Sequence, residues 1–226
     1  MGREYNILEN FEATESIICQ QLPIILYINL AHREDRKKEF LSNFVDHDHS
    51  HVVRVDAVLD KNNGAIGCLK SHIKALKMAM DLPYQNMLIC EDDFEFRDIT
   101  CKRDLMESLQ YVPNDWDVIM FAHNTSDSRA TQHKKIIQVL DSQTASCYLV
   151  RKEYIPKLLN IFEKDLNIYM KTNQWKSQYC NDQSWKILQK KDKWYAIQPS
   201  LGKQRKSYSD IQKGVVNYEL FSSTYK

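Results

Sequence analysis

The sequence predicts an α/β domain in which a mostly parallel central sheet is flanked by helices. Residues 23–30 (PIILYINL) and 86–92 (NMLICED), which are rich in apolar side chains, are typical of buried strands. Between them, residues 64–82 are expected to form an amphipathic helix, because apolar side chains recur there at helical spacing. Strands that alternate with helices favour parallel pairing, with helices on both faces of the sheet. The apolar positions of this helix are Ile66, Leu69, Ile73, Leu76 and Met80.

The other elements follow from the same periodicities in chain order. Further strands are expected at residues 51–58, 116–122 and 193–201, the last of these being the final strand. An apolar run at residues 145–150 leads into a helix at 152–162. Other helices are expected at residues 31–45, 101–112 and 181–191. The last of them is short, and we expect Asn181 or Asp182 to cap it.

The composition is that of an ordinary globular protein without a strongly charged partner. The chain has 226 residues, a hydrophobic fraction of 43% and a formal net charge of +1. This balance provides no overall electrostatic reason to bind nucleic acid or an acidic membrane surface. Five glycines and five prolines argue against long linkers. We therefore expect one domain at residues 23–226, preceded by an appendage at residues 1–22.

Localisation and redox state can be predicted in the same way. Residues 1–21 lack the basic start and apolar block of a secretory signal. No apolar run approaches the roughly 18–20 residues needed to cross a bilayer. The six cysteines never pair as Cys-x-x-Cys, and several lie in apolar runs. We interpret them as buried free thiols rather than a disulfide framework, which favours a reducing, cytoplasmic compartment.

Three adjacent acids, Glu91, Asp92 and Asp93, stand directly after an apolar strand and directly before Phe94. Adjacent carboxylates repel one another, and charge near a core edge is costly. A divalent cation would offset that cost, and carboxylate oxygens suit Mg²⁺, Mn²⁺ or Ca²⁺. Ligands of such sheets bind beyond the carboxyl ends of the strands, where this triplet lies. The triplet alone also fits a solvated acidic turn, whereas the acid spacing of an EF-hand is absent.

Two further segments carry polar residues that fit a site at the same edge. Residues 28–36 (INLAHREDR) end a strand with polar Asn29 and then add basic side chains. Residues 64–72 (GAIGCLKSH) start a helix with two glycines and carry Ser71 and His72. Each feature also has an ordinary interpretation, as a solvated helix face, a turn or a core histidine.

Taken together, the order and spacing of these segments resemble glycosyltransferase family 25, which includes lipooligosaccharide galactosyltransferases and collagen β-galactosyltransferases. The matching motifs are the INL segment with its basic residues, GAIGCLKSH and LICEDD. The likeness runs from Ile24 to Tyr218 through DWDVIMFA, TASCYLVRKEYIPKLL and CNDQSW. Residues 199–211 (PSLGKQRKSYSDI) resemble collagen-type members and their relatives in large DNA viruses. The cytoplasm in which we expect this protein therefore includes the cytoplasm of a cell infected by such a virus.

The resemblance implies a GT-A-type fold for nucleotide-diphospho-sugar transferases, a UDP-sugar donor, and Mn²⁺ or Mg²⁺ as the metal. Glu-Asp-Asp would be the family's version of an Asp-x-Asp motif, in which the outer acids make the contacts. The implied metal ligands are Glu91 and Asp93, with Gln204 as the third in preference to Tyr208 or Asp210. The implied donor-binding positions are Asn29, Leu30, Arg33, Arg36, Asp56, Ser71, His72, Glu91, Asp92, Lys203 and Arg205.

The reaction itself needs charge stabilisation and a base. Breaking a sugar–phosphate bond leaves negative charge on UDP, which a bridging cation and nearby Arg or Lys side chains neutralise. The basic loop 202–207 (GKQRKS) fits this role, or it is a solvated turn. An inverting transfer also needs one general base, for which Asp182 is the candidate unless it only caps its helix. Ala65 and Ile66 depart from the family pattern and put some pocket contact in doubt.

The expected function is thus transfer of galactose or glucose to a hydroxyl of a glycan or a hydroxylysine-type protein. The alternative is a catalytically silent protein of the same fold that acts in binding or as a scaffold. A metal-dependent phosphoesterase would require a second cluster of acids or histidines to form a two-metal site, and the sequence shows no obvious one. The sequence does not identify the acceptor or the oligomeric state. Tyr169, Trp175 and Tyr179 either stack on a sugar face or pack in the core.

Overall fold

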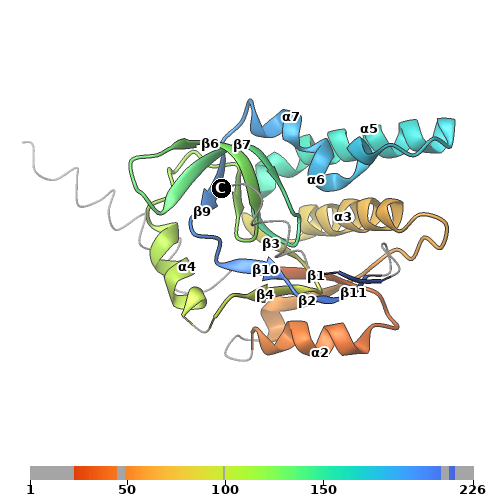
Figure 1. Ribbon diagram of the computed structural model, residues 1–226, viewed down its shortest axis with the longest axis horizontal. Coiled ribbons are helices and arrows are strands. Elements are labelled where there is room, and N and C mark those ends of the chain that lie inside the picture. Colours follow the sequence, from red (N-terminus) through yellow and green to blue (C-terminus); the bar gives the residue numbers. More distant parts are fainter. Residues whose placement is uncertain (1–22, 45–48, 99, 210–213, 217–226) are drawn as a thin grey trace, which may run out of the picture.

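The computed structural model describes residues 23–44, 49–98, 100–209 and 214–216 (Figure 1). The expected appendage at residues 1–22 lies outside the described residues, as do Cys19, Asp210 and Tyr218. The large sheet contains β1 (Ile25–Asn29), β2 (Val52–Asp56), β3 (Asn86–Glu91), β5 (Val118–Met120), β6 (Asn124–Ala130), β7 (Ile136–Gln143), β8 (Cys147–Arg151) and β9 (Trp194–Ile197). Two short pairs are formed by β4 (Phe94–Phe96) with β10 (Gly202–Gln204) and by β11 (Ser207–Ser209) with β12 (Gly214–Val216). The α-helices are α2 (Glu34–Ser42), α3 (Gly64–Asp81), α4 (Cys101–Leu109), α5 (Ile155–Thr172), α6 (Asn181–Ser184) and α7 (Lys186–Gln189).

The large sheet has the strand order β2-β1-β3-β8-β5-β9-β7-β6. Strand β1 pairs in parallel with β2 and β3, and β5 pairs in parallel with β9. Strands β8 and β7 are antiparallel to both of their neighbours. The other six strands of the sheet therefore run in one direction, which confirms the predicted mostly parallel sheet. Their carboxyl ends gather at one edge.

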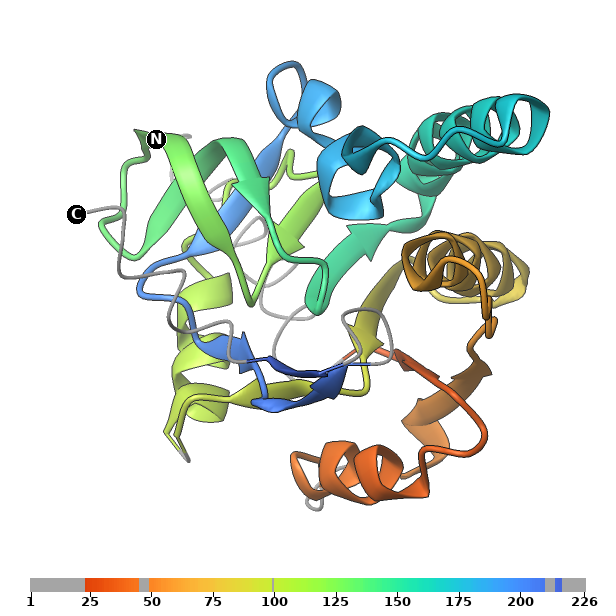
Figure 2. The ribbon, with the colours of Figure 1, turned by 45° about the vertical axis from the view of Figure 1, so that its right-hand side comes forward.

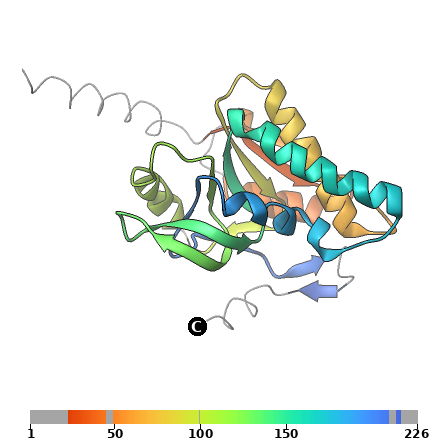
Figure 3. The same ribbon diagram turned by 90° about the horizontal axis from the view of Figure 1, so that it is seen from above.

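Helices cover the two faces of the sheet, and alternate residues of β1 show which helices cover each face. Leu26 and Ile28 belong to one core cluster, which also contains side chains of α3 and α5. Ile25 and Tyr27 belong to the other, which contains Phe40 of α2 and residues of α4. Helices α3 and α5 pack together on their face, with α2 on the far side of the sheet (Figures 2 and 3). This two-sided burial explains why β1 is apolar throughout.

Several elements differ from the expected ones, each for a physical reason. Residues 193–201 do not form the final strand, because β10, β11 and β12 follow; each has three residues, too few to show a periodicity. Strand β6 was not expected because its sequence, NTSDSRA, is polar and mostly exposed. Its partner β7 was missed because its buried residues recur every third position rather than every second.

The expected helix at residues 181–191 is in fact two short helices, α6 and α7. The N-cap of α6 is Cys180, which makes no side-chain capping hydrogen bond, so the prediction that Asn181 or Asp182 caps it is wrong. The thiol prediction is confirmed for the described cysteines, which are all free. Cys90, Cys101 and Cys147 are buried, whereas Cys68 and Cys180 are half-buried. Among the described helices, none has the length and apolar character that a bilayer span requires.

Strand pairing brings the C-terminal segment to the carboxyl edge of the sheet. Ile28 of β1 stands beside Glu91 at the end of β3. The chain turns there into β4, which pairs with β10 so that Gln204 lies opposite Phe94. Glycine is needed at position 202, because a Cβ there would lie 2.1 Å from the Phe94 ring. Residues 202–209 can therefore lie close against the acid triplet.

Candidate active site

The acid triplet lines a pocket of about 150 Å³ at the carboxyl edge of β1 and β3. Asp92 and Asp93 are only 6% and 8% exposed, although carboxylates are normally found in water. The pocket wall continues through the start of α3, the segment after β2 and the C-terminal segment. Its polar lining includes Arg33, Arg36, Asp60, Cys68, Ser71, His72, Gln204 and Ser209.

Asp92, the middle acid, is fully paired inside the protein. Its Oδ1 accepts a hydrogen bond from Arg36 Nη1 at 2.8 Å, and its Oδ2 accepts one from Asn29 Nδ2 at 2.7 Å. Asn29 is itself held by Arg54, whose Nε donates to Asn29 Oδ1 at 2.9 Å. Burial still raises the pKa of Asp92 above its ordinary value. Both oxygens of this side chain are therefore held within the protein, where they order the edge of the sheet.

Asp93 differs from its neighbour because one of its oxygens has no protein partner. Its Oδ1 is buried without a hydrogen bond, and its Oδ2 is 3.5 Å from Arg36 Nη1. Burial, reinforced by the charge of Glu91, raises the pKa of Asp93 to about 7. A buried, unpaired carboxylate oxygen in a pocket wall is costly unless a cation or a donor occupies the adjacent space.

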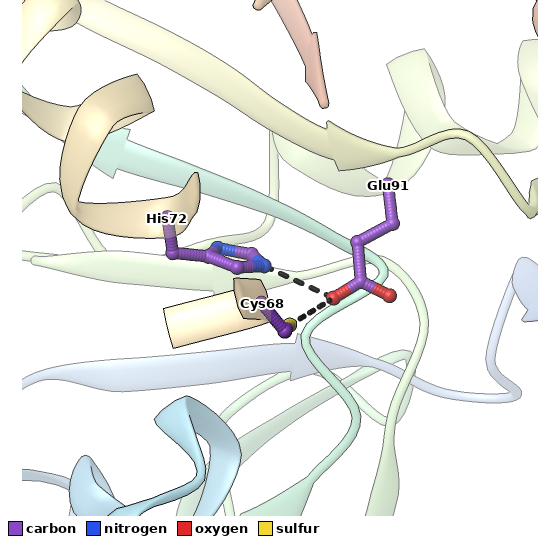
Figure 4. Close-up of side chains that lie close together, drawn as sticks. All are labelled: Cys68, His72 and Glu91. Carbon is purple, nitrogen blue, oxygen red and sulfur yellow. Dashed lines mark hydrogen bonds and ion pairs between the residues drawn. The ribbon is translucent and has the colours of Figure 1, made fainter. Parts of the chain in front are cut away.

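Glu91 directs its two oxygens to different neighbours. Its Oε1 lies 3.0 Å from His72 Nε2 and 3.6 Å from the thiol of Cys68 (Figure 4). Its Oε2 accepts a hydrogen bond of 3.4 Å from Gln204 Nε2. Burial is the largest single influence and acts to raise the pKa of Glu91, but the hydrogen bond and charge of His72, the Cys68 thiol and the charge of Arg36 together lower the pKa. Glu91 is therefore the acid of the triplet that stays ionised most readily.

The N-terminal turns of α3 close against the segment after β2. Asn63 caps the helix by accepting hydrogen bonds from the amides of Ala65 and Ile66. A Cβ on Gly67 would lie 2.6 Å from the carbonyl oxygen of Val58, so this approach depends on glycine.

The Ser71 hydroxyl joins the same two segments. It donates to the Gly67 carbonyl oxygen at 2.6 Å and accepts from the Val58 amide at 2.8 Å. Ser71 thus lines the pocket as predicted, but its hydroxyl is already used in holding this wall together. Ile66, one of the two departures from the family pattern, is a buried residue of α3. It does not line the pocket.

The C-terminal segment is tied to the triplet from the other side. Arg36 Nη2 donates to Ser207 Oγ at 2.7 Å and to the Tyr208 carbonyl at 2.8 Å. The backbone amide of Arg205 donates to the Asp93 carbonyl at 2.6 Å. These contacts place Gln204 beside Glu91 and bring Ser209 into the lining.

Not every predicted donor-binding residue reaches the pocket. Lys203 and Arg205 pair with Glu95 of β4, at 3.4 Å and 2.9 Å, and Arg205 also pairs with Glu39. Neither basic side chain is part of the lining. Asp56 is exposed at the end of β2, where it pairs with Arg54 at 2.6 Å, and it does not line the pocket either. Leu30, Arg33 and Arg36 do line it, as expected for residues that follow β1.

Asp182, the predicted base, lies just beyond the lining in α6. Its Oδ2 accepts a hydrogen bond of 3.2 Å from the Thr144 amide. Burial, together with the charge of Glu91, raises its pKa. The neighbouring Asn181 is connected to the pocket wall, because its Oδ1 lies 3.8 Å from the Cys68 thiol. The structure therefore brings the base candidate close to the acid triplet without placing it in the pocket wall.

Sequence reasoning missed Cys68 and residues 57–60 as part of the lining. Cys68 is four residues before His72 in a helix, so both side chains lie on one face. That spacing was a usable signal. Residues 57–60 carried none, because only the close approach at Gly67 brings them to the pocket.

The oxygen donors of Glu91, Asp93 and Gln204 beside the pocket fit a divalent cation. The unpaired Asp93 Oδ1, the ionised Glu91 carboxylate and the side-chain amide of Gln204 are hard oxygen donors of the kind that Mg²⁺ and Mn²⁺ prefer. Asp92 is less suited to this role, because short hydrogen bonds from Arg36 and Asn29 already hold each of its oxygens.

Residues 61–173 match the family model described as glycosyltransferase family 25 (LPS biosynthesis protein). This range contains α3, the acid triplet and all of α5, and it amounts to half of the chain. No curated protein sequence matches the chain.

Solved structures give a second comparison. The chain resembles the glycosyltransferase GlyE of Streptococcus pneumoniae TIGR4 with a TM-score of 0.51 and 9% identity, covering 91% of this chain and 60% of that one. It therefore spans about 60% of the length of GlyE. A glycosyltransferase involved in the glycosylation of the major capsid of PBCV-1 gives a TM-score of 0.47 and 9% identity, covering 88% of this chain and 98% of that one. At such identity, the likeness to GlyE concerns the fold alone, and it confirms the predicted GT-A-type α/β fold.

Proposed function

The chain belongs to glycosyltransferase family 25, and we propose that it is a metal-dependent, inverting enzyme that moves galactose or glucose from a UDP-sugar to a hydroxyl acceptor. The observation that carries the proposal is Asp93 Oδ1, a buried oxygen without a partner in the pocket wall. It stands beside Glu91 at the carboxyl edge of the sheet, where α/β proteins bind their ligands. A nucleotide diphosphate that brings a cation would supply the missing partner.

We assign the ion and the diphosphate to the part of the pocket that Glu91, Asp93 and Gln204 line. Glu91 and Asp93 would hold Mn²⁺ or Mg²⁺ with the Gln204 amide as the third protein group. When bound, the cation would neutralise the charge that develops on the departing UDP. Arg36 keeps Asp92 paired, so the charge of Asp93 is directed to the ligand. Arg33 and Arg36, which line the pocket, are the cationic side chains beside the leaving group.

Asp182 is the proposed general base for the acceptor hydroxyl. Its raised pKa makes its carboxylate a better proton acceptor than an ordinary surface aspartate. The hydrogen bond from the Thr144 amide orients one oxygen and leaves the other directed towards Gln183, at 3.4 Å. The acceptor would be a glycan or a hydroxylysine-type protein, which approaches from the α6 side of the pocket.

Trp175 is the proposed stacking platform for an acceptor sugar. Trp175 is 36% exposed as a residue, and the rings of Tyr169 and Tyr179 lie at steep angles to its ring with centroids 6.2 Å and 6.1 Å away. An exposed aromatic side chain of this kind can stack on the apolar face of a sugar.

The metal and nucleotide assignment is tested by calorimetric titration of UDP with and without Mn²⁺. We expect tight binding only with Mn²⁺, and loss of that dependence in Asp93→Asn, which keeps the shape of the side chain and removes its charge. Asp127→Asn is the matched control, since Asp127 is exposed on β6 at the far edge of the sheet. Equal UDP affinity with and without the ion, or an unaffected Asp93→Asn protein, would contradict the assignment.

A hydrolysis screen separates an active enzyme from a silent binding protein of the same fold. We expect slow, Mn²⁺-dependent release of UDP from UDP-galactose or UDP-glucose, in preference to release of nucleotide from GDP- or CMP-sugars. Binding of UDP without hydrolysis of any sugar nucleotide would favour the silent protein. Faster turnover of a GDP-sugar would overturn the choice of donor.

A further inference from the structure

Three side chains of different chemistry converge on the inner side of the pocket. The atoms concerned are Cys68 Sγ, His72 Nε2 and a carboxylate oxygen of Glu91, which all lie within 4.8 Å of one another (Figure 4). Cys68 and His72 come from consecutive turns of α3, and Glu91 comes from the end of β3. The three residues belong to the pocket lining, so an ion in the pocket can reach them.

The spacing of these donors suits a small transition-metal ion. Zinc binds sulfur at about 2.3 Å and imidazole nitrogen or carboxylate oxygen at about 2.0–2.2 Å, in a tetrahedron. Ligand atoms of such a tetrahedron stand roughly 3–4 Å apart. Glu91 Oε1 lies 3.0 Å from His72 Nε2 and 3.6 Å from Cys68 Sγ, within this range before any movement.

The surroundings of His72 resemble the outer shell of a metal-bound histidine. Its Nδ1 lies 3.1 Å from the Tyr148 hydroxyl, and the two rings stack with their centroids 5.9 Å apart. A partner for the second ring nitrogen fixes the tautomer and orientation of a histidine ligand. Both His72 and Tyr148 are fully buried, so the imidazole is held in this position.

We propose that Cys68, His72 and Glu91 bind a borderline transition-metal ion of the Zn²⁺ class, at a site that adjoins the hard-cation site of Asp93 and shares only Glu91 with it. The sulfur and nitrogen donors select such an ion over Mg²⁺ or Mn²⁺. As the Sγ–metal bond forms, the Cys68 thiol releases its proton to solvent. Asn181 lies beside the cluster, with its Oδ1 3.8 Å from Cys68 Sγ, and could supply a further oxygen donor.

The two sites share Glu91 through different oxygens. Its Oε1 faces Cys68 and His72, whereas its Oε2 faces Gln204. A Zn²⁺ ion on the Oε1 side draws charge from this carboxylate, so it weakens the hard-cation site that the proposed function requires. This last consequence rests on the proposed function, whereas binding of the ion does not.

The test uses Co²⁺ as an optical probe on the full, reduced chain. We expect the thiolate-to-cobalt charge-transfer absorption and the intense visible bands of a tetrahedral ion, and loss of both when Zn²⁺ is added. Cys68→Ser should abolish the charge-transfer absorption and weaken Co²⁺ binding by more than the roughly 10–100-fold that loss of an outer-shell partner costs. Cys101→Ser, a buried thiol of the α4 core, is the matched control and should leave the spectrum unchanged.

Asp93→Asn serves as the second variant. We expect it to keep the thiolate–cobalt spectrum, since Asp93 belongs to the other site. A spectrum without thiolate absorption in the wild type, an unchanged spectrum in Cys68→Ser, or its loss in Asp93→Asn would each overturn the proposed Cys68–His72–Glu91 site. The two proposals fail independently, because the UDP titration in Mn²⁺ reports on the function and the cobalt spectrum reports on this site.

Discussion

Arg36 and Asp92, which lie 56 residues apart in the chain, form an ion pair of 2.8 Å at the edge of the pocket. The two side chains are only 12% and 9% exposed. The other guanidinium nitrogen of Arg36 binds Ser207 Oγ and the Tyr208 carbonyl oxygen. One side chain of α2 therefore connects the end of β3 to the C-terminal segment that supplies Gln204.

Replacing Arg36 should destabilise the whole domain. Arg36→Met leaves Asp92 buried with only Asn29 as a partner, and removing one member of a buried pair typically costs about 3–5 kcal/mol. We expect the unfolding free energy measured with denaturant to fall by about 3 kcal/mol, at the low end of this range. The reason is that Asp92 keeps its hydrogen bond from Asn29 and is slightly exposed to water. Lys37→Met on the same helix is the control, since its pair with Glu34 is 34% and 59% exposed and should contribute less than about 1 kcal/mol. Equal effects of the two substitutions would show that the Arg36–Asp92 pair does not hold the edge together.

Asp93 should make the metal-free protein less stable as the pH rises. Its pKa is about 7 in the folded state and roughly 3.9 in an unfolded chain. Between these values the folded protein keeps a proton that the unfolded chain has lost, so stability falls as the pH increases through this window. Asp93→Asn removes this term.

We therefore expect Asp93→Asn to melt higher than the wild type at pH 8 without added metal, and the difference to vanish below pH 4. A pKa unit corresponds to ~1.4 kcal/mol, so the gain should reach at least ~1 kcal/mol, or about 2–4 °C in a domain of this size. Added Mn²⁺ should reverse the order of the two proteins. A difference in melting temperature that is independent of pH would rule out a titrating Asp93.

Gly67→Ala should disturb the wall between α3 and the segment after β2. The new Cβ would meet the Val58 carbonyl oxygen at 2.6 Å, and backbone cannot rotate aside as a side chain can. We expect a loss of ~1–3 kcal/mol in unfolding free energy, typical of overpacking, together with weaker UDP binding in Mn²⁺. Wild-type stability in this variant would mean that the segment yields without cost. Ser71→Ala, which removes the hydroxyl bridge between the same segments, should shift both measurements in the same direction.

Asp182→Asn separates a base from a structural aspartate. The asparagine Oδ1 can still accept the hydrogen bond from the Thr144 amide, so the melting temperature and UDP affinity should stay near the wild-type values. Transfer to an acceptor should fall by roughly 10²–10⁴-fold, because the amide cannot take the proton. Asp141→Asn, which breaks a partly exposed pair with Lys186, is the control for a carboxylate lost nearby. Transfer within a few-fold of the wild type would mean that the base lies elsewhere.

The local sequence pattern was sufficient to predict the elements that are long and whose buried residues recur at a regular spacing. Helix α3 and strands β1, β2 and β3 were predicted because their apolar spacing reports burial on one or both faces. The ends of these strands placed Asn29 and the acid triplet at one edge, since parallel strands share a carboxyl edge. Strands β4, β6, β10, β11 and β12 were missed, because short or exposed strands leave no periodic trace, and β7 was missed because its buried residues recur every third position.

The sequence by itself determined a mostly parallel α/β sheet with three acids at the end of a strand, and the family resemblance predicted that a Gly-x-x-Gly helix start and a Ser-His pair lie beside them. Only the tertiary structure decided which groups are free to act. Asp92 and Asp93 are chemically equivalent in the sequence, yet Arg36 and Asn29 pair one of them and leave an oxygen of the other unpaired. Lys203 and Arg205 are likewise committed to Glu95, on a strand that no pattern revealed. The partner of a side chain depends on which distant segments pack beside it and on how much water these segments exclude. The residues next to it in the sequence determine neither.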